Sequence, residues 1–176
     1  DFLFRNYVYV SSTSPVFVAH FDAFATTVFA RFNLSQKSFV VDIGSNDGIL
    51  LKPFKKLGAR VLGVEPDTRI AGLARKAGIP TVSEFFTPLM AKKLIKKYGQ
   101  ADVVTATNVF AHIDDIHAVA QGVKTLLKRE GVFIVEVPYL VDFLDKNLFD
   151  TVYHEHLSYL SVSALSRFFE GVGMKI

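Results

Sequence analysis

The stretch 39–50 constrains the fold more than any other part of the chain. It opens with an apolar, β-branched run at 39–43, and Gly44, a short polar segment and Gly48 follow. The run predicts a buried strand, and the small and polar residues after it predict a tight turn into the N-terminus of a helix. In open α/β sheets, a strand, loop and helix in this order form the mouth of a nucleotide or cofactor site.

A second apolar run supports a site of this kind. The run at 60–64 ends at Glu65, which lies 21 positions after Gly44. Folds of this class keep a carboxylate about 20 residues after the loop, where it binds ribose hydroxyls. We therefore assign Glu65, with Pro66 beside it, to the ribose part of a cofactor site.

The loop does not match a dinucleotide fingerprint, which needs a second Gly two positions after the first so that the backbone can approach a pyrophosphate. Asn46 occupies that position, and the pattern is Asp-x-Gly-x-x-x-Gly. It resembles motif I of the class I S-adenosylmethionine (SAM) methyltransferases. The resemblance implies a Rossmann-like fold, SAM as the cofactor and a loop that frames its methionine part through Asp42, Gly44, Ser45, Asn46 and Gly48.

Strand and helix patterns alternate along the rest of the chain. Apolar runs predict strands at 39–43, 60–64, 80–82, 101–106 and 132–137. Periodicity and capping residues predict helices from Pro15 to Asn33, over about 48–57, from Asp67, from Pro88 to Tyr98 and from Asp115 to Arg129. On the first helix, a buried face is expected to hold Phe17, Phe21, Phe24, Val28 and Phe32. This alternation predicts an α/β fold with a doubly wound, mostly parallel sheet flanked by helices.

Composition narrows the class of protein. Half of the 176 residues are hydrophobic and 17 are Phe, so we expect one domain with a sizeable core. No apolar run is long enough to span a membrane, no signal peptide is visible, and a cytoplasmic location is the default. The net charge is only +3, and the lysines between Lys92 and Lys97 follow helical spacing, which indicates a solvated helix face and no nucleic-acid partner. The chain has no Cys, so thiolate metal sites are excluded.

We divide the chain into an aromatic N-terminal arm, 1–13, and a SAM-binding domain, 14–176. The arm is read as a segment packed on the core or as a lid that presents a Tyr to the substrate. The chain begins with Asp1 and ends on a helix that leads toward a strand, so we expect a fragment of a longer protein whose last strands are missing. The oligomeric state is left open.

Residues after the third predicted strand suit the adenine of a cofactor. Glu84 and Phe85 follow that strand at the carboxyl end of the sheet, where ligands bind. A polar side chain and an aromatic ring can hold an adenine by its amine and its face. Equally, Phe85 and Phe86 can be ordinary core residues.

A second cluster of polar residues, 153–159, follows the fifth predicted strand. His154 and His156 alternate on one side of an extended segment, which allows a metal site, although zinc would need a third ligand and none is obvious nearby. The second interpretation is a structural polar edge. The third is acid–base catalysis, in which a His moves the proton and Glu155 or Tyr153 assists.

The chain also resembles the SAM-dependent sugar C-methyltransferases that act on thymidine-diphosphate 4-keto-deoxysugars. The matching stretches are 7–12, 41–48, 63–66, 108–113, 136–139 and 153–159. The resemblance implies that His156 is the base, that Glu155 and Tyr153 assist it, and that Tyr7 or Tyr9 lies near the sugar. It implies no metal in this chain and places Asn108 in the segment that faces the reaction. Members of that family also carry a Cys-rich zinc-binding segment before the arm and a further C-terminal domain.

Two other functions are open at this point. The first is a small-molecule O- or N-methyltransferase, which needs a base for a hydroxyl or amine but would show no exchange of a proton beside a ketone. The second is a SAM-binding domain without catalysis. We expect a nucleotide sugar as the substrate, without knowledge of its identity or of the carbon that is methylated.

Overall fold

The computed structural model describes residues 2–5, 9–149, 152–153 and 155–176. Its centre is a five-stranded sheet in the order β3-β2-β1-β4-β5. Every pair of neighbouring strands is parallel. The strands are β1 (Phe39–Ile43), β2 (Arg60–Val64), β3 (Thr81–Val82), β4 (Ala101–Thr107) and β5 (Leu127–Glu136). The predicted α/β fold with a parallel sheet is confirmed.

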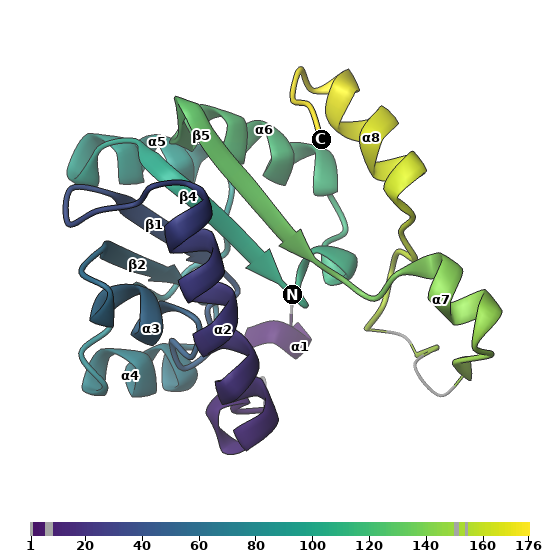
Figure 1. Cartoon of the computed structure of the whole chain (residues 1–176), viewed down its shortest axis with the longest axis horizontal. Helices are drawn as coiled ribbons and strands as arrows, with labels where there is room; N and C mark the ends of the chain where they lie inside the picture. Colours follow the sequence, from purple (N-terminus) through teal and green to yellow (C-terminus); the bar gives the residue numbers. More distant parts are fainter. Residues whose placement is uncertain (1, 6–8, 150–151, 154) are drawn as a thin grey trace.

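Helices alternate with the strands and cover both faces of the sheet (Figure 1). They are α1 (Phe2–Arg5), α2 (Pro15–Arg31), α3 (Leu51–Lys56), α4 (Thr68–Lys76), α5 (Pro88–Tyr98), α6 (Ile116–Leu126), α7 (Leu140–Asp145) and α8 (Val162–Gly171). Short 3-10 turns are η1 (Ser11–Thr13) and η2 (Phe110–His112). Side chains at the N-caps accept backbone N–H groups and explain several helix starts, namely those after Ser14, Asp67, Thr87, Asp115 and Ser161.

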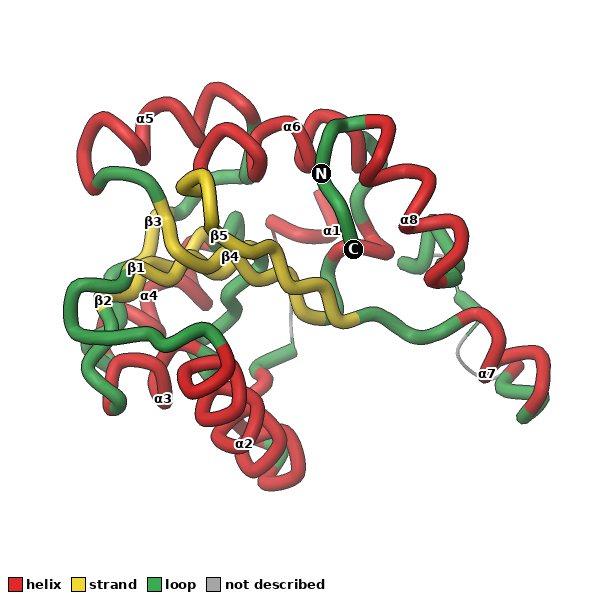
Figure 2. Tube along the Cα trace, turned by 45° about the horizontal axis from the view of Figure 1, so that its top comes forward, coloured by secondary structure: helices red, strands yellow, loops and turns green. Residues whose placement is uncertain are grey.

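Each face of the sheet has its own hydrophobic core. Figure 2 shows α5 and α6 on one side of the strands and α2 and α3 on the other. The first core joins α5, α6 and Phe169 of α8 to β1, β2 and β4. The second joins α2, α3 and Ala74 of α4 to the opposite face of the same strands. Burial on both faces explains why β1 is apolar along its length, apart from Asp42.

Two predictions about helices were wrong in detail. Helix α6 ends at Leu126, because Leu127 already pairs with Ala101 of β4 and begins β5. The apolar and basic residues there continue the helical pattern, but strand pairing prevails. On α2 the buried residues are Phe21, Ala25 and Val28, whereas Phe17 and Phe32 are each 36% exposed. Phe17 lies in the first turn of α2 and Phe32 is its C-cap, so the core covers the middle of this helix and leaves its ends partly exposed.

The carboxyl ends of the parallel strands meet at one edge of the sheet, which we call the carboxyl edge. Gly44 and Ser45, after β1, donate backbone hydrogen bonds to the carbonyl of Val64 in β2. Asn108, after β4, donates to the carbonyl of Glu136 at the end of β5. These bonds fix the segments that follow the strands, where ligands bind in folds of this class. No helix among the described residues is long and apolar enough to cross a membrane.

Candidate functional site

The loop after β1 needs its glycines for two separate reasons. Gly44 has φ +68° and Gly48 has φ +80°, values that residues with a side chain rarely adopt. A Cβ on Gly44 would lie 2.7 Å from Val109 Cγ2, and one on Gly48 would lie 3.0 Å from Ile79 Cγ1. The loop is therefore closely packed at Gly44 against the segment after β4 and at Gly48 against Ile79, which precedes β3, and a side chain at either glycine would push these segments apart.

Glu65 is held at the predicted position by the loop itself. Its Oε2 accepts the backbone N–H of Asn46 at 2.9 Å, and its Oε1 accepts that of Asp67 at 3.0 Å. Burial raises the pKa of Glu65, and these two hydrogen bonds oppose the rise. A carboxylate oxygen can accept more than one hydrogen bond. Each oxygen therefore retains capacity for a ribose hydroxyl, and Pro66 directly follows at partial exposure.

Asp42 lies beneath the loop and is 2% exposed. The hydroxyl of Thr105 in β4 donates to its Oδ1 at 2.6 Å. The pKa of Asp42 is raised to about 7, chiefly by burial; the Thr105 hydrogen bond opposes the rise, and the nearby Glu65 adds to it. Asp42 thus joins β1 to β4 inside the sheet, and its role in cofactor binding stays a prediction.

The loop has buried polar atoms that fit a ligand with hydrogen-bond donors. Within the described residues, Ser45 Oγ and Asp47 Oδ1 are buried without a hydrogen-bond partner. The Ser45 side chain lies against β2, where a Cβ on Gly63 would be 2.4 Å from Ser45 Oγ. Asp47 Oδ1 is the acceptor that suits an ammonium or hydroxyl donor, while Asp47 Oδ2 pairs with Lys52 at 3.1 Å. With the carboxylate of Glu65, this set matches the donors on the methionine and ribose parts of SAM.

The candidate adenine residues differ in their surroundings. Phe86 is buried in the core, whereas Phe85 is half-buried and its ring carries the Arg5 guanidinium 5.0 Å from its centroid. Glu84 is exposed, and its carboxylate lies 3.8 Å from Lys93 Nζ. Glu84 and Phe85 therefore both keep accessible positions beside β3, and Arg5 of the arm partly covers Phe85.

The arm is tied to the cofactor loop through Asn46, which has φ +48°. Its Oδ1 accepts the backbone N–H of Ser11 at 2.9 Å, and its Nδ2 donates to the carbonyl of Tyr9 at 3.0 Å. The Tyr9 side chain is exposed, while Tyr7 lies outside the described residues. The arm thus contacts the loop through Asn46 and Phe85 through Arg5, while a Tyr beside the sugar stays a prediction.

Residues 155–159 lie against η2, which follows β4. The backbone N–H groups of Leu157 and Ser158 both donate to the carbonyl of Ala111. This places the His156 ring 5.0 Å from the His112 ring, measured between centroids. Tyr153 and Tyr159 complete the ring cluster around His156, at 4.4 Å and 5.9 Å.

The two histidines have different surroundings. Burial and, to a smaller extent, the neighbouring His156 lower the pKa of His112 to about 4. His112 also stacks on Phe4 of the arm at 5.7 Å. Burial raises the pKa of Tyr153, with Glu155 and Tyr159 adding to the rise. His112 is therefore neutral at pH 7, and Tyr153 keeps its proton.

Sequence reasoning did not identify three of the residues at the carboxyl edge. His112 had no assigned role, His20 was read as a packing or surface residue, and Glu136 was noted only as part of a matching stretch. In the structure, His20 Nε2 lies 2.7 Å from Glu136 Oε2, and Asn108 Nδ2 donates to Glu136 Oε1. Glu136, a charged residue at the end of an apolar strand, was the one signal in the sequence that could have pointed to these contacts.

The prediction that this chain binds no metal concerns the same site. No group of three or more potential metal ligands occurs within 2–5, 9–149, 152–153 and 155–176, and His154 lies outside these residues, so the absence of a metal stays a prediction.

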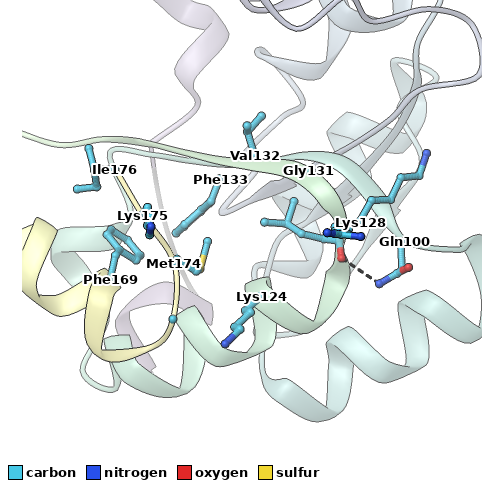
Figure 3. Close-up of a pocket in the computed structure, with 13 residues that line it drawn as sticks. Gln100, Lys124, Lys128, Gly131, Val132, Phe133, Phe169, Met174, Lys175 and Ile176 are labelled. Carbon is cyan, nitrogen blue, oxygen red and sulfur yellow. Dashed lines mark hydrogen bonds between the residues drawn. The ribbon is translucent and has the colours of Figure 1, made fainter.

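A cavity of about 670 Å³ lies at the amino end of β5, where Gln100 donates to the Leu127 carbonyl (Figure 3). Its lining includes the basic side chains of Lys124, Lys128 and Lys175 and none of the cofactor residues above.

Comparisons with known proteins agree with this geometry. Residues 19–176 match a family described as a methyltransferase domain. The chain is 40% identical to the C-methyltransferase NovU of Streptomyces niveus over 176 residues, all of this chain and 42% of that protein. It is 30% identical to a ubiquinone biosynthesis O-methyltransferase of Rhodopseudomonas palustris over 97 residues, which is 54% of this chain and 38% of that protein. The chain thus spans less than half the length of these relatives.

The fold is shared with solved structures. The plantazolicin methyltransferase BpumL, in complex with a pentazolic desmethylPZN analog and SAH, superposes with a TM-score of 0.67. The match covers 90% of this chain and 64% of that one at 15% identity. The chain therefore belongs to the methyltransferase-domain family, has the Rossmann-like fold of its SAM-dependent members and takes SAM as its cofactor.

Proposed function

We propose that this chain is the cofactor-binding and base-carrying part of an enzyme that methylates carbon beside the ketone of a nucleotide-linked 4-keto-deoxysugar. The observation that carries the proposal is the pairing of His112 with His156 at the carboxyl edge, 5.0 Å apart. It places a proton-handling cluster next to the segment that packs on the Gly44 turn. The 40% identity to a C-methyltransferase supports carbon as the acceptor.

The loop and its neighbours hold the cofactor in this proposal. Glu65 binds the ribose, Phe85 the adenine, and the loop backbone with Asp47 the methionine part. When bound, SAM supplies the electrophilic methyl group that an enolate carbon accepts. The protein's task is to fix its position beside the acceptor carbon, and positioning of this kind contributes several kcal/mol.

His156 removes the proton beside the ketone. A neutral imidazole can take a proton near pH 7, and Glu155 and Tyr153 lie on the same stretch to orient it. Neutral His112 puts no second positive charge beside the imidazolium that forms. The enolate oxygen needs a hydrogen-bond donor, which Tyr153, or Tyr7 or Tyr9 of the arm, supplies.

Methylation of oxygen is the competing function, and similarity to an O-methyltransferase over half of the chain favours it. There the same base would act on a hydroxyl. The two functions differ in the atom that receives the methyl group and in whether a C–H proton exchanges with solvent.

The test is product analysis with the full-length protein. We would incubate it with SAM carrying a ¹³C-methyl group and a panel of thymidine-diphosphate 4-keto-deoxysugars, and read the methyl chemical shift by NMR. A C-methyl signal supports the proposal, and an O-methyl signal supports the alternative. SAM binding without methylation of any sugar would indicate a SAM-binding domain without catalysis and contradict the proposal.

A further inference from the structure

His20, Glu136 and Asn108 converge at the carboxyl edge from three different elements. His20 is on α2, Glu136 ends β5, and Asn108 follows β4. His20 Nε2 lies 2.7 Å from Glu136 Oε2, and Asn108 Nδ2 donates to Glu136 Oε1 at 3.1 Å. Glu136 therefore uses one carboxylate oxygen for each neighbour, and a single carboxylate links the two outer groups.

The backbone of Asn108 is fixed at the same place. Its φ is +55°, a left-handed conformation that Asn tolerates better than most residues. Its N–H donates to the Glu136 carbonyl at 2.7 Å. The next residue, Val109, packs on the Gly44 turn of the cofactor loop. Asn108 is exposed, so its amide lies beside the cofactor loop and open to a ligand.

The chemistry of the carboxylate sets the orientation of this amide. An ionised carboxylate only accepts hydrogen bonds, so Asn108 must turn its nitrogen toward Glu136 and its Oδ1 away. Within the described residues, no group donates a hydrogen bond to Asn108 Oδ1. Its Oδ1 is therefore an acceptor presented to a donor on the ligand. His20 Nε2 lies within hydrogen-bond distance of the other carboxylate oxygen of Glu136, and in the tautomer with its proton on Nε2 the ring donates to that oxygen.

We propose that His20 and Glu136 are positioning residues that hold the Asn108 amide so that Oδ1 accepts a hydrogen bond from a sugar hydroxyl of the acceptor substrate. The inference rests on the proposed function. On a 4-keto sugar nucleotide, the ketone and the diphosphate only accept, so the sugar hydroxyls are the donors near the reacting carbon. This contact selects sugars that carry a hydroxyl next to the methylated position.

The test measures selectivity in the full-length enzyme. The probes are thymidine-diphosphate 4-keto-6-deoxyglucose and its analogues that lack the C2 or the C3 hydroxyl, and the readout is the ratio of their kcat/KM values. Asn108→Gly keeps the backbone conformation and deletes the amide, so the preference for one hydroxyl falls about tenfold. In Glu136→Gln, the new side-chain amide can face Asn108 with either its oxygen or its nitrogen. We therefore expect the ratio of kcat/KM values to fall several-fold.

A matched pair of variants tests His20. His20→Gln keeps an N–H donor at similar reach, whereas His20→Phe keeps the ring that packs on Phe21 and Phe24 but has no donor. We expect the Gln variant to retain the parent ratio and the Phe variant to lose it. A purely structural role would lower melting temperature or kcat in both without a change in selectivity.

An NMR measurement on the present chain separates the two proposals. The side-chain N–H protons of Asn108 should exchange with solvent several-fold more slowly in the parent and in His20→Gln than in His20→Phe, because a hydrogen-bonded N–H exchanges more slowly than one open to water. Exchange of the Asn108 side-chain protons as fast in the parent as in His20→Phe, or an unchanged kcat/KM ratio in Asn108→Gly, would overturn the inference. If the parent methylates no keto-sugar nucleotide, the proposed function fails and the substrate contact fails with it, while the NMR result still decides the positioning of the amide.

Discussion

The rings of His112 and His156 lie 5.0 Å apart although helix α6, strand β5 and helix α7 separate them in the chain. The contact depends on the Ala111 carbonyl, which accepts two backbone N–H groups from residues 157 and 158. It brings the segment after β4 and the polar stretch after β5 to one place. The proposed base thus gains its neighbours from the tertiary fold.

The first prediction concerns the titration of His112. Burial, with His156 as a second cause, lowers the pKa of His112 to about 4, whereas its ordinary value is 6.5. The unfolded chain binds more protons than the folded one between these values, so the free energy of unfolding should rise as pH rises from about 4 to 6.5. NMR titration should give a His112 pKa near 4 in the parent and a higher value in His156→Ala, where the second ring is absent. A His112 pKa at its ordinary value in the parent would contradict the packing of this pair.

The second prediction concerns Glu65. Glu65→Ala removes the acceptor for the N–H groups of Asn46 and Asp67 and for the ribose, and hydrogen bonds to a charged group contribute about 1.5–3 kcal/mol each. We expect SAM affinity to fall at least tenfold in calorimetry, together with a lower melting temperature. Glu130→Gln, at an exposed carboxylate at the other end of the sheet, is the control and should bind SAM as the parent does. A Glu65→Ala protein that binds SAM as tightly as the parent would contradict the assignment of Glu65 to the cofactor site.

Asn46 should control the order of the N-terminal arm. Asn46→Gly preserves the left-handed backbone but loses both hydrogen bonds to the arm, each of which contributes about 0.5–1.5 kcal/mol. Faster hydrogen exchange at Ser11 is expected, measured by mass spectrometry. Asn46→Asp still accepts from Ser11 but cannot donate to Tyr9, so its exchange rate should lie between the two. Equal exchange in all three proteins would show that Asn46 does not hold the arm.

Gly63 should tolerate no side chain. Gly63→Ala would place a Cβ 2.4 Å from Ser45 Oγ and 3.0 Å from Thr81 Oγ1, and overpacking of this kind costs about 1–3 kcal/mol. Gly72→Ala is the matched control, because only Arg75 Nη2 lies within 4.0 Å of its Cβ and Ala favours the helix by up to about 1 kcal/mol. Urea unfolding should therefore show opposite signs for the two variants. A Gly63→Ala protein as stable as the parent would mean that the loop is not packed on β2.

Local patterns were enough to predict most of the fold. The runs at β1 and β2 are apolar because both faces of the sheet are covered, and Ser14, Thr87 and Asp115 mark helix starts by their capping side chains. The end of α6 could not be read in this way. Its sequence continues as a helix would, and the pairing of Leu127 with Ala101 decides the boundary.

The residues of the site show the same difference between what local patterns predict and what tertiary pairing decides. Asn46 and Glu65 belong to patterns with fixed spacing, so the sequence predicted their neighbourhood. The contact of His20 with Glu136 joins the first long helix to the last strand, and no spacing rule relates them. Such contacts appear only when the segments have been placed in space.

The most direct test of the account is proton exchange at the substrate carbon. The full-length enzyme and its keto-sugar nucleotide would be incubated in heavy water, and deuterium beside the ketone would be followed by NMR. We predict exchange by the parent and by His117→Ala, an exposed histidine on α6 outside the site. In His156→Ala, exchange should fall by about 10²–10⁴ while SAM binding is unchanged, because general-base catalysis contributes a factor of that size. Exchange by His156→Ala at the parent rate would place the base elsewhere and contradict the account.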